Sequence, residues 1–178
     1  MAFSQSILLA GFGGQGILFT GKVIAYAGLV EEHEVSWLPS YGPEMRGGTA
    51  NCSITISDEP IGSPLIINPS ALVAMNLPSL DKFIDNVLPG GTVVVDSTLI
   101  NKKVDRTDIN AFYVPATGLA DEKGLSGLAN MIILGKLLKE TKFADYDSVI
   151  AGLRKTVPAR KAQLIDSNIK AINLGMEL

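Results

Sequence analysis

The chain has 178 residues, of which 47% are hydrophobic and 19% are charged, and its formal net charge is −3. This length fits one domain with a substantial core. Ordinary domains carry about 25% charged residues, so we expect another subunit to cover part of this surface, with a compact monomer as the alternative. The charges are spread without a basic run, which argues against a nucleic-acid partner. No apolar run reaches the ~18 residues of a membrane span.

The single cysteine, Cys52, cannot form an internal disulfide, and no Cys/His spacing indicates a zinc or iron–sulfur site. The first positive charge is Lys22, so the basic region of a secretory signal is missing. We therefore expect a cytoplasmic protein that holds no metal of its own.

The first predicted strand and helix enclose a glycine motif. Residues 7–10 form an apolar run typical of a strand buried on both faces, and residues 17–29 can continue as a helix. Between them, Gly11, Gly13 and Gly16 match the spacing G-x-G-x-x-G of a phosphate-binding turn. The loop amides and the start of the helix would present free N–H groups to an anion. A tight turn without a ligand is the alternative, because glycine alone satisfies that backbone geometry.

The second predicted strand, residues 35–38, follows an acidic turn at residues 31–34. A nicotinamide-binding Rossmann unit needs Asp or Glu at the end of this strand to hold the ribose hydroxyls. Here the strand ends in leucine, proline and serine at residues 38–40, which argues against a dinucleotide cofactor.

The next segment is predicted to be an irregular loop, because four helix-breaking residues lie within ten positions. It carries one aromatic ring, one carboxylate and one guanidinium, on Tyr41, Glu44 and Arg46. With Gly47 and Gly48 behind it, Arg46 would form an anion clamp, a forked donor beside exposed amides. The alternative is a structural loop in which Arg46 pairs with Glu44.

The rest of the chain predicts further strands and helices and ends in helices. Strands are expected at residues 51–57, 71–75, 92–96 and 111–115. Helices are expected at residues 80–88, 128–139, 146–155 and 161–174. Ser79 is the expected N-cap of the first of these helices, and residues 118–127 are expected to form a loop. Asp96 ends a strand where open α/β sheets place ligands, so it has either a functional role or, as we expect, a role in capping the next turn. The apolar residues 130–135 should be buried.

We therefore predict one α/β domain over residues 1–178. It would be Rossmann-like, with a mostly parallel sheet flanked by helices and a helical C-terminal end.

Three segments in order carry a family resemblance: Gly11-Phe12-Gly13-Gly14-Gln15-Gly16, then residues 40–48 reading S-Y-G-P-E-M-R-G-G, then residues 130–135 reading N-M-I-I-L-G. Together they resemble the gamma subunit of 2-oxoacid:ferredoxin oxidoreductases, over essentially the whole chain. The family includes pyruvate, 2-oxoisovalerate and 2-oxoglutarate enzymes. The residues of its first two motifs would then face either an anionic group or a partner subunit, and our hypothesis is that they bind an anionic group such as a phosphate of CoA. These residues are Gly11, Gly13, Gly14, Gln15, Gly16, Tyr41, Gly42, Glu44, Arg46, Gly47 and Gly48.

The resemblance implies an enzyme that decarboxylates a 2-oxoacid on thiamine diphosphate, reduces ferredoxin through iron–sulfur clusters and releases an acyl-CoA. Thiamine diphosphate, its Mg and the 4Fe–4S clusters would belong to alpha, beta and delta partner chains. This chain would hold no cofactor and no catalytic residue, and would support the assembly near the CoA path. The general appearance of the sequence resembles a 2-oxoglutarate or branched-chain 2-oxoacid enzyme more than a pyruvate enzyme.

Two other functions are compatible with the residues. One is a stand-alone Rossmann enzyme that binds NAD or FMN, and the other is a purely structural subunit without a ligand. The isolated chain could also form a homodimer through the surface meant for its partners.

Overall fold

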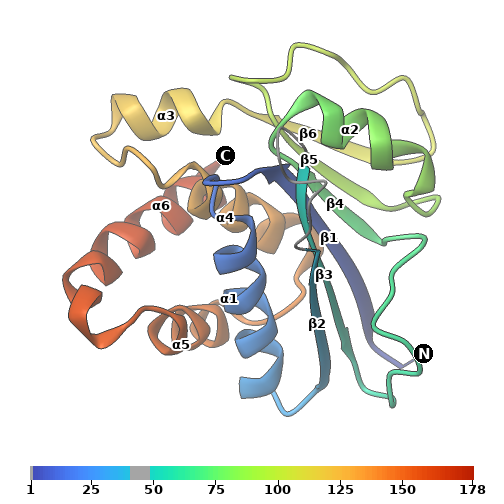
Figure 1. Ribbon diagram of the computed structural model, residues 1–178, viewed down its shortest axis with the longest axis horizontal. Coiled ribbons are helices and arrows are strands. Elements are labelled where there is room, and N and C mark those ends of the chain that lie inside the picture. Colours follow the sequence, from blue (N-terminus) through green and yellow to red (C-terminus); the bar gives the residue numbers. More distant parts are fainter. Residues whose placement is uncertain (1, 41–48) are drawn as a thin grey trace.

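The computed structural model describes residues 2–40 and 49–178 (Figure 1). In chain order the elements are β1 (Ser4–Phe12), α1 (Ile17–Val30), β2 (Glu34–Ser40), β3 (Thr49–Ser57), β4 (Ala71–Ala74), α2 (Leu77–Phe83), the 3-10 helix η2 (Ile84–Asn86), β5 (Thr92–Asp96), β6 (Asn110–Val114), α3 (Ala116–Glu122), α4 (Ala129–Thr141), α5 (Tyr146–Thr156), the 3-10 helix η3 (Ala159–Leu164) and α6 (Ile165–Glu177). The α/β architecture with a helical C-terminal end is confirmed.

The six described strands form one sheet in the order β2-β3-β1-β4-β5-β6. β1, β4, β5 and β6 are parallel neighbours, whereas β3 runs antiparallel to both β1 and β2. Among the described strands, β3 alone therefore points the other way, and the predicted mostly parallel sheet is confirmed. The centre of β1 is buried on both faces, from Ile7 to Ala10, as its continuous apolar run predicted.

The position of β3 separates β1 from β2. Leu9 of β1 lies opposite Cys52 of β3, and Cys52 lies opposite Pro39 of β2. Because neighbouring strands lie about 4.8 Å apart, the end of β2 stands about 10 Å from the end of β1. In a nicotinamide-binding Rossmann unit these two strands are parallel neighbours. The chain thus lacks both the ribose carboxylate and the strand order that would place it.

The two faces of the sheet are covered unequally (Figure 1). The larger core packs β1, β3 and β4 against α1, α4, α5 and α6, and the smaller core packs β4 and β5 against α2. Since α1 follows β1 on one face and α2 follows β4 on the other, the carboxyl ends of β1 and β4 form a topological switch point. Ligands of open α/β sheets bind at such crevices.

Helix α4 is buried from Asn130 to Leu138, as its apolar sequence predicted. It crosses α6 where two glycines meet. A Cβ atom added to Gly135 would overlap the carbonyl oxygen of Ile172, and one added to Gly175 would overlap that of Ile132. Two backbones therefore touch at this crossing, and a side chain at either glycine would force the helices apart.

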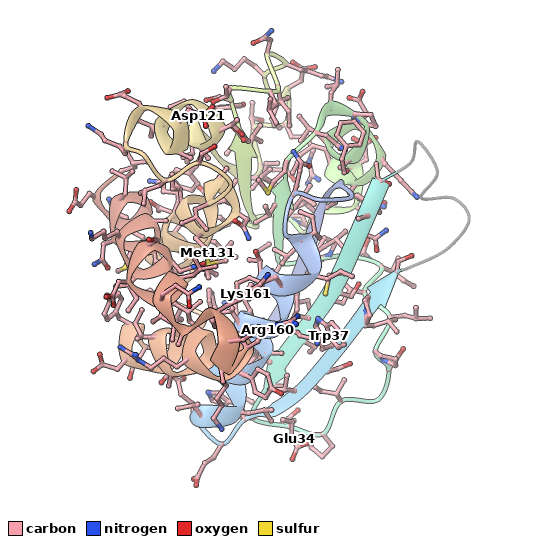
Figure 2. All side chains as sticks on the ribbon, turned by 60° about the vertical axis from the view of Figure 1, so that its left-hand side comes forward. Glu34, Trp37, Asp121, Met131, Arg160 and Lys161 are labelled. Atoms are coloured by element: carbon pink, nitrogen blue, oxygen red, sulfur yellow. The ribbon has the colours of Figure 1, made fainter. Side chains whose placement is uncertain are left out.

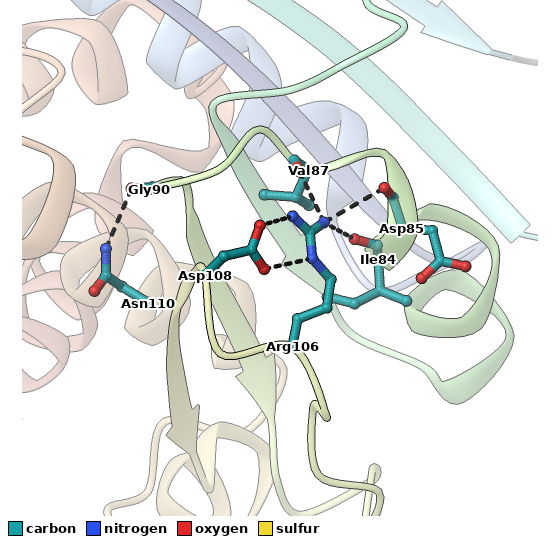
Figure 3. Close-up of polar contacts among 7 residues, drawn as sticks. All are labelled: Ile84, Asp85, Val87, Gly90, Arg106, Asp108 and Asn110. Atoms are coloured by element: carbon teal, nitrogen blue, oxygen red, sulfur yellow. Dashed lines mark hydrogen bonds and ion pairs between the residues drawn. The ribbon is translucent and has the colours of Figure 1, made fainter.

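On the other face, Arg106 closes the smaller core (Figure 3). Its Nη1 donates to the carbonyl oxygens of Ile84 at 2.9 Å and Val87 at 2.7 Å. Its Nε and Nη2 donate to the two carboxylate oxygens of Asp108 at 2.9 and 2.6 Å. The hydrogen bonds from Arg106 lower the pKa of Asp108. This clamp ties the segment before β6 to the end of η2.

The predicted start of α2 is wrong. Its N-cap is Asn76, whose Oδ1 accepts the amide of Ser79 at 2.9 Å. The intervening Pro78 has no N–H to satisfy and fits the first turn of a helix, so the cap lies three residues earlier than predicted. The helix also ends earlier, at Phe83, and continues only as the 3-10 turn η2.

Part of the loop expected at residues 118–127 is helix α3. Ala116 and Ala120, one turn apart, are both buried, and the amide of Gly118 donates to Thr98 Oγ1 at 3.0 Å. Tertiary contacts thus hold a helix through a glycine that suggested a loop. The last predicted helix is also divided: Lys161 has non-helical backbone angles within the 3-10 helix η3, and the α-helix α6 begins only at Ile165.

Candidate functional site

The glycine motif lies at the switch point between β1 and β4, with its first glycine inside β1. Gly11 pairs with Ala50 of β3. A Cβ atom there would lie 2.5 Å from Gln15 Oε1 and 3.2 Å from the Cβ of Met75. A side chain at this position would therefore displace the Gln15 amide group from its place over β1, and glycine avoids this contact.

Gln15 closes the loop over this glycine. Its Oε1 accepts the amide of Phe12 at 2.6 Å, and its Nε2 donates to the carbonyl oxygen of Met75 at 3.0 Å. The amide of Gln15 also donates to the carbonyl oxygen of Phe12 at 3.3 Å. The side chain thus fixes the loop of β1 to the end of β4, which is a positioning role.

Gly16 is the N-cap of α1 and has a φ angle of 76°, in the left-handed region. Its carbonyl oxygen accepts from the Thr20 amide at 3.0 Å, from Thr20 Oγ1 at 2.9 Å and from Asn130 Nδ2 at 3.4 Å. Asn130 Nδ2 also donates to Thr20 Oγ1 at 3.1 Å. A Cβ atom on Gly16 would overlap the Asn130 amide, so this glycine sets α1 against α4.

Gly13 and Gly14 differ from the other glycines of the motif. A Cβ atom on either would meet no atom of the described chain within 4 Å. Gly14 has a φ angle of 87°, which favours glycine, but the φ angle of Gly13 is not positive. Neither the described contacts nor the backbone conformation therefore requires glycine at position 13.

The amides of this loop are available to a ligand. Within the described residues, the N–H groups of Gly13, Gly14 and Gly16 donate to no acceptor, and no side chain caps α1. The first turn of this 14-residue helix adds further free donors and a partial positive charge. This arrangement suits an anionic group such as a phosphate.

A cavity of about 330 Å³ lies beside the loop at the switch point. Its lining includes Gly14 and Gln15 of the motif, Met75 after β4, Thr117 and Asp121 of α3, and Asn130 of α4. The start of α4 also borders the cavity, through Ala129 and Asn130, and no side chain of the described residues caps this helix. Asn130 Oδ1 is buried without a hydrogen-bond partner among the described residues.

Asp96, at the end of β5, has a structural role. It is fully buried, and its carboxylate accepts from the amide of Thr98 at 3.1 Å and from Thr117 Oγ1 at 2.6 Å. These bonds cap the turn after β5 and the start of α3. The capping role predicted for Asp96 is confirmed.

The residues of the second motif, Tyr41, Gly42, Glu44, Arg46, Gly47 and Gly48, lie outside the described residues. The strand ends that flank them are described. Thr49, the first residue of β3, lies opposite Phe12, and Ser40, the last residue of β2, lies opposite Asn51. The segment therefore rejoins the sheet directly beside the glycine loop.

The sequence analysis did not identify Thr20 and Asn130 as residues that hold the glycine loop. A threonine one turn into α1 and an asparagine in an otherwise apolar helix are the signals that could have indicated them. Cys52 is fully buried, and its burial raises the pKa of its thiol to about 12.

Two negative findings concern residues 2–40 and 49–178. This part of the chain contains no group of three or more His, Cys, Asp or Glu side chains arranged to hold a metal ion. None of its helices combines the length and the apolar character needed to cross a membrane.

Comparison with known proteins gives a family match and several relatives. The family model described as pyruvate ferredoxin/flavodoxin oxidoreductase matches residues 6–178. The ketoisovalerate oxidoreductase subunit VorA of Methanothermobacter thermautotrophicus is 39% identical over 172 residues, covering 96% of this chain and 35% of that protein. The 2-oxoglutarate synthase subunit KorC of Methanocaldococcus jannaschii is 34% identical over 177 residues, covering 98% of this chain and 93% of that protein. The chain thus spans about a third of VorA and nearly all of KorC.

Solved structures share the fold. A keto/oxoacid ferredoxin oxidoreductase gamma subunit from Geobacter sulfurreducens aligns with a TM-score of 0.83 and 26% identity, covering 97% of this chain and 96% of that chain. The 2-oxoglutarate:ferredoxin oxidoreductase of Magnetococcus marinus aligns with a TM-score of 0.86 and 23% identity, and this chain covers 30% of it. From its family match and its relatives, the chain belongs to the pyruvate ferredoxin/flavodoxin oxidoreductase family.

Proposed function

We propose that this chain is the gamma subunit of a 2-oxoacid:ferredoxin oxidoreductase. The complex would oxidise a 2-oxoacid with CoA to an acyl-CoA, CO2 and reduced ferredoxin in the cytoplasm. The names of the relatives support this, because the KorC proteins are separate subunits of similar length. A subunit named as common to pyruvate and ketoisovalerate oxidoreductases in Pyrococcus abyssi is 27% identical and is covered over 92% of its length.

In this proposal the redox chemistry belongs to partner subunits. The alpha, beta and delta chains would hold thiamine diphosphate, Mg and the 4Fe–4S clusters, and ferredoxin would accept the electrons. The chain described here has one cysteine, and a cluster of this kind needs several thiolate ligands. Its own part would be to complete the assembly around CoA.

The main support for a role near CoA is the presence of glycine at position 13. The described residues around it leave room for a side chain, and its φ angle is not in the region that favours glycine. A ligand or a partner subunit that approaches the loop closely would explain why position 13 is glycine. Because free amides and the start of α1 lie there, we assign the approach to a phosphate of CoA.

The motif residues then divide by role. Gly11, Gln15 and Gly16 hold the loop, and Gly13 and Gly14 present their amides. Tyr41, Gly42, Glu44, Arg46, Gly47 and Gly48 are proposed to complete the anion site, with the Arg46 guanidinium as the charged donor.

The alternatives have less support. A stand-alone NAD enzyme is disfavoured because β3 separates β1 from β2 and because β2 ends without a carboxylate. A purely structural subunit would give no role to the amides of Gly13 and Gly14, which donate to no acceptor among the described residues.

The direct test is to purify a tagged copy of the chain from its own cells under anaerobic conditions. We expect partner chains that contain thiamine diphosphate and iron to co-purify, and the eluate to reduce a viologen with CoA and a 2-oxoacid. We expect 2-oxoglutarate or a branched-chain 2-oxoacid as the preferred substrate. A chain that elutes alone, without this activity but with bound NAD(P)H or FMN, would contradict the proposal.

A further inference from the structure

A second hollow lies between α1, β2 and η3, and it shares Gly127 and Asn130 with the cavity at the switch point. It has a volume of about 530 Å³. Its walls include Leu18, Phe19 and Lys22 of α1, Trp37 of β2, and Lys161 and Leu164 of η3. Figure 2 looks onto this side of the molecule, with Trp37 and Lys161 labelled.

The hollow continues along α1 as an apolar strip. An adjoining depression of about 270 Å³ shares Lys22 and Trp37 with it and adds Tyr26 and Leu29. Leu29 is 51% exposed, which is unusual for a leucine beside such a hollow. From Gly16 to Leu29 the strip follows α1 for about 20 Å, at about 1.5 Å per residue. We call the whole surface the α1 groove, defined by Leu18, Phe19, Lys22, Tyr26, Leu29, Trp37, Lys161 and Leu164.

The charge of the α1 groove is opposite in sign to that of the whole chain. The described residues that line it include Lys22 and Lys161 but no carboxylate, although the chain has a net charge of −3. Neither lysine forms an ion pair within the described residues. Lys22 is exposed, and its Nζ lies 5.2 Å from the centre of the Trp37 ring.

The η3 wall of the groove is only loosely attached to the domain. No residue of η3 is buried, and Leu164 at its end is 44% exposed. An apolar side chain in this position gains little from folding of the isolated chain. It would gain from a partner that fills the groove.

We propose that the α1 groove binds an amphipathic helix of a partner subunit, apolar on one side and acidic along its edges. This inference rests on the proposed function, that the chain is a subunit of a larger enzyme. A helix of about four turns matches the length of the strip, and its acidic residues would pair with Lys22 and Lys161.

Shape and charge favour this occupant over two others. A compact small molecule would fill the larger hollow and leave Tyr26 and Leu29 uncovered. A second copy of the chain would bring the lysines of one α1 groove toward those of the other, which like-charge repulsion opposes.

The test uses the native complex, purified anaerobically through a tag on this chain. In the double variant Lys22→Glu/Lys161→Glu, we expect partner subunits to be lost at least tenfold more readily in a salt wash. The matched control is Lys82→Glu on α2, because Lys82 is exposed and its Nζ also lies 5.2 Å from an aromatic ring, that of Phe83. A photo-crosslinking residue in place of Tyr26 should attach to an acidic, amphipathic peptide of a partner subunit.

The outcomes separate the two proposals. If the wild-type chain binds no oxidoreductase subunits, the proposed function fails. If it binds them and the double variant binds them as tightly, the groove inference alone is wrong. An unchanged assembly with a raised KM for CoA would assign the groove to a small ligand instead. A wild-type homodimer that the double variant dissociates would assign it to a second copy, and either result overturns the inference.

Discussion

The glycines at the α4–α6 crossing and those in the β1 loop have different surroundings, and we expect their substitution to have different effects. At the crossing, a Cβ atom on Gly135 or Gly175 would overlap a carbonyl oxygen of the facing helix. In the loop, a Cβ atom on Gly13 or Gly14 would meet nothing within 4 Å in the described chain. The first pair is explained by packing within the fold, whereas no contact among the described residues explains glycine at position 13, and Gly14 is favoured there by its φ angle of 87°.

This difference separates stability from function. Residues that pack inside the domain should change its thermal unfolding when they are substituted. Residues that face outward from the loop should leave unfolding unchanged and act only in the assembled enzyme. Gly11, Gln15 and Gly16 lie between these cases, because they support the loop from within the chain.

The largest expected effect is at the crossing. Alanine at Gly135 or Gly175 must move two backbones apart, so we expect about 3 kcal/mol of lost stability or more. For a chain of this size, the Tm should fall by about 6–12 °C. Calorimetry of the isolated chain measures this fall. A change in Tm below about 1 °C would show that the crossing tolerates a methyl group. Packing would then not explain the glycines at positions 135 and 175.

An intermediate effect is expected for Gln15→Ala. It removes the acceptor for the amide of Phe12 and the donor to Met75, which should cost about 1–2 kcal/mol, since water can reach part of this site. We expect a modest fall in Tm together with weaker activity of the complex, because the loop loses its support. Asn101→Ala, in the segment after β5, is the control, as Asn101 is exposed and has no side-chain hydrogen bond among the described residues. Equal behaviour of the two variants would contradict a positioning role for Gln15.

How far the sequence could predict this fold depended on how local each signal was. The apolar run in β1 and the apolar α4 were located correctly, since burial follows directly from their composition. Helix α3 was missed because its evidence is tertiary, in the burial of Ala116 and Ala120 and the bond from Gly118 to Thr98. The insertion of β3 between β1 and β2 was also missed, because strand order depends on pairing between distant segments.

The candidate site was predicted in part. The glycine spacing located the loop, but not the division between packed glycines and open ones, which depends on Met75 and Asn130 far along the chain. The α1 groove had no sequence signal, because Lys22, Trp37 and Lys161 come from three separate elements.

A smaller effect is expected at Arg106 and Asp108, an exposed contact outside both sets of glycines. The lowered pKa of Asp108 means that its carboxylate stabilises the fold above the usual carboxyl range. This contribution should be lost as the pH falls through the folded pKa. Asp108→Asn should therefore lower the Tm slightly at neutral pH, by less than Gln15→Ala, and the difference from wild type should shrink in acid. A difference that grows in acid would contradict the pairing with Arg106.

The measurement that tests the central claim most directly compares Gly13→Ala with Gly62→Ala. Both glycines have open space where an added Cβ atom would lie and no positive φ angle, but Gly62 lies outside the motif. We predict that both variants unfold within about 0.5 kcal/mol of wild type. In the purified complex, Gly13→Ala should lower kcat/KM for CoA at least tenfold, whereas Gly62→Ala should leave it unchanged. Equal and normal activity of both complexes would contradict the claim that the β1 loop serves a contact outside this chain.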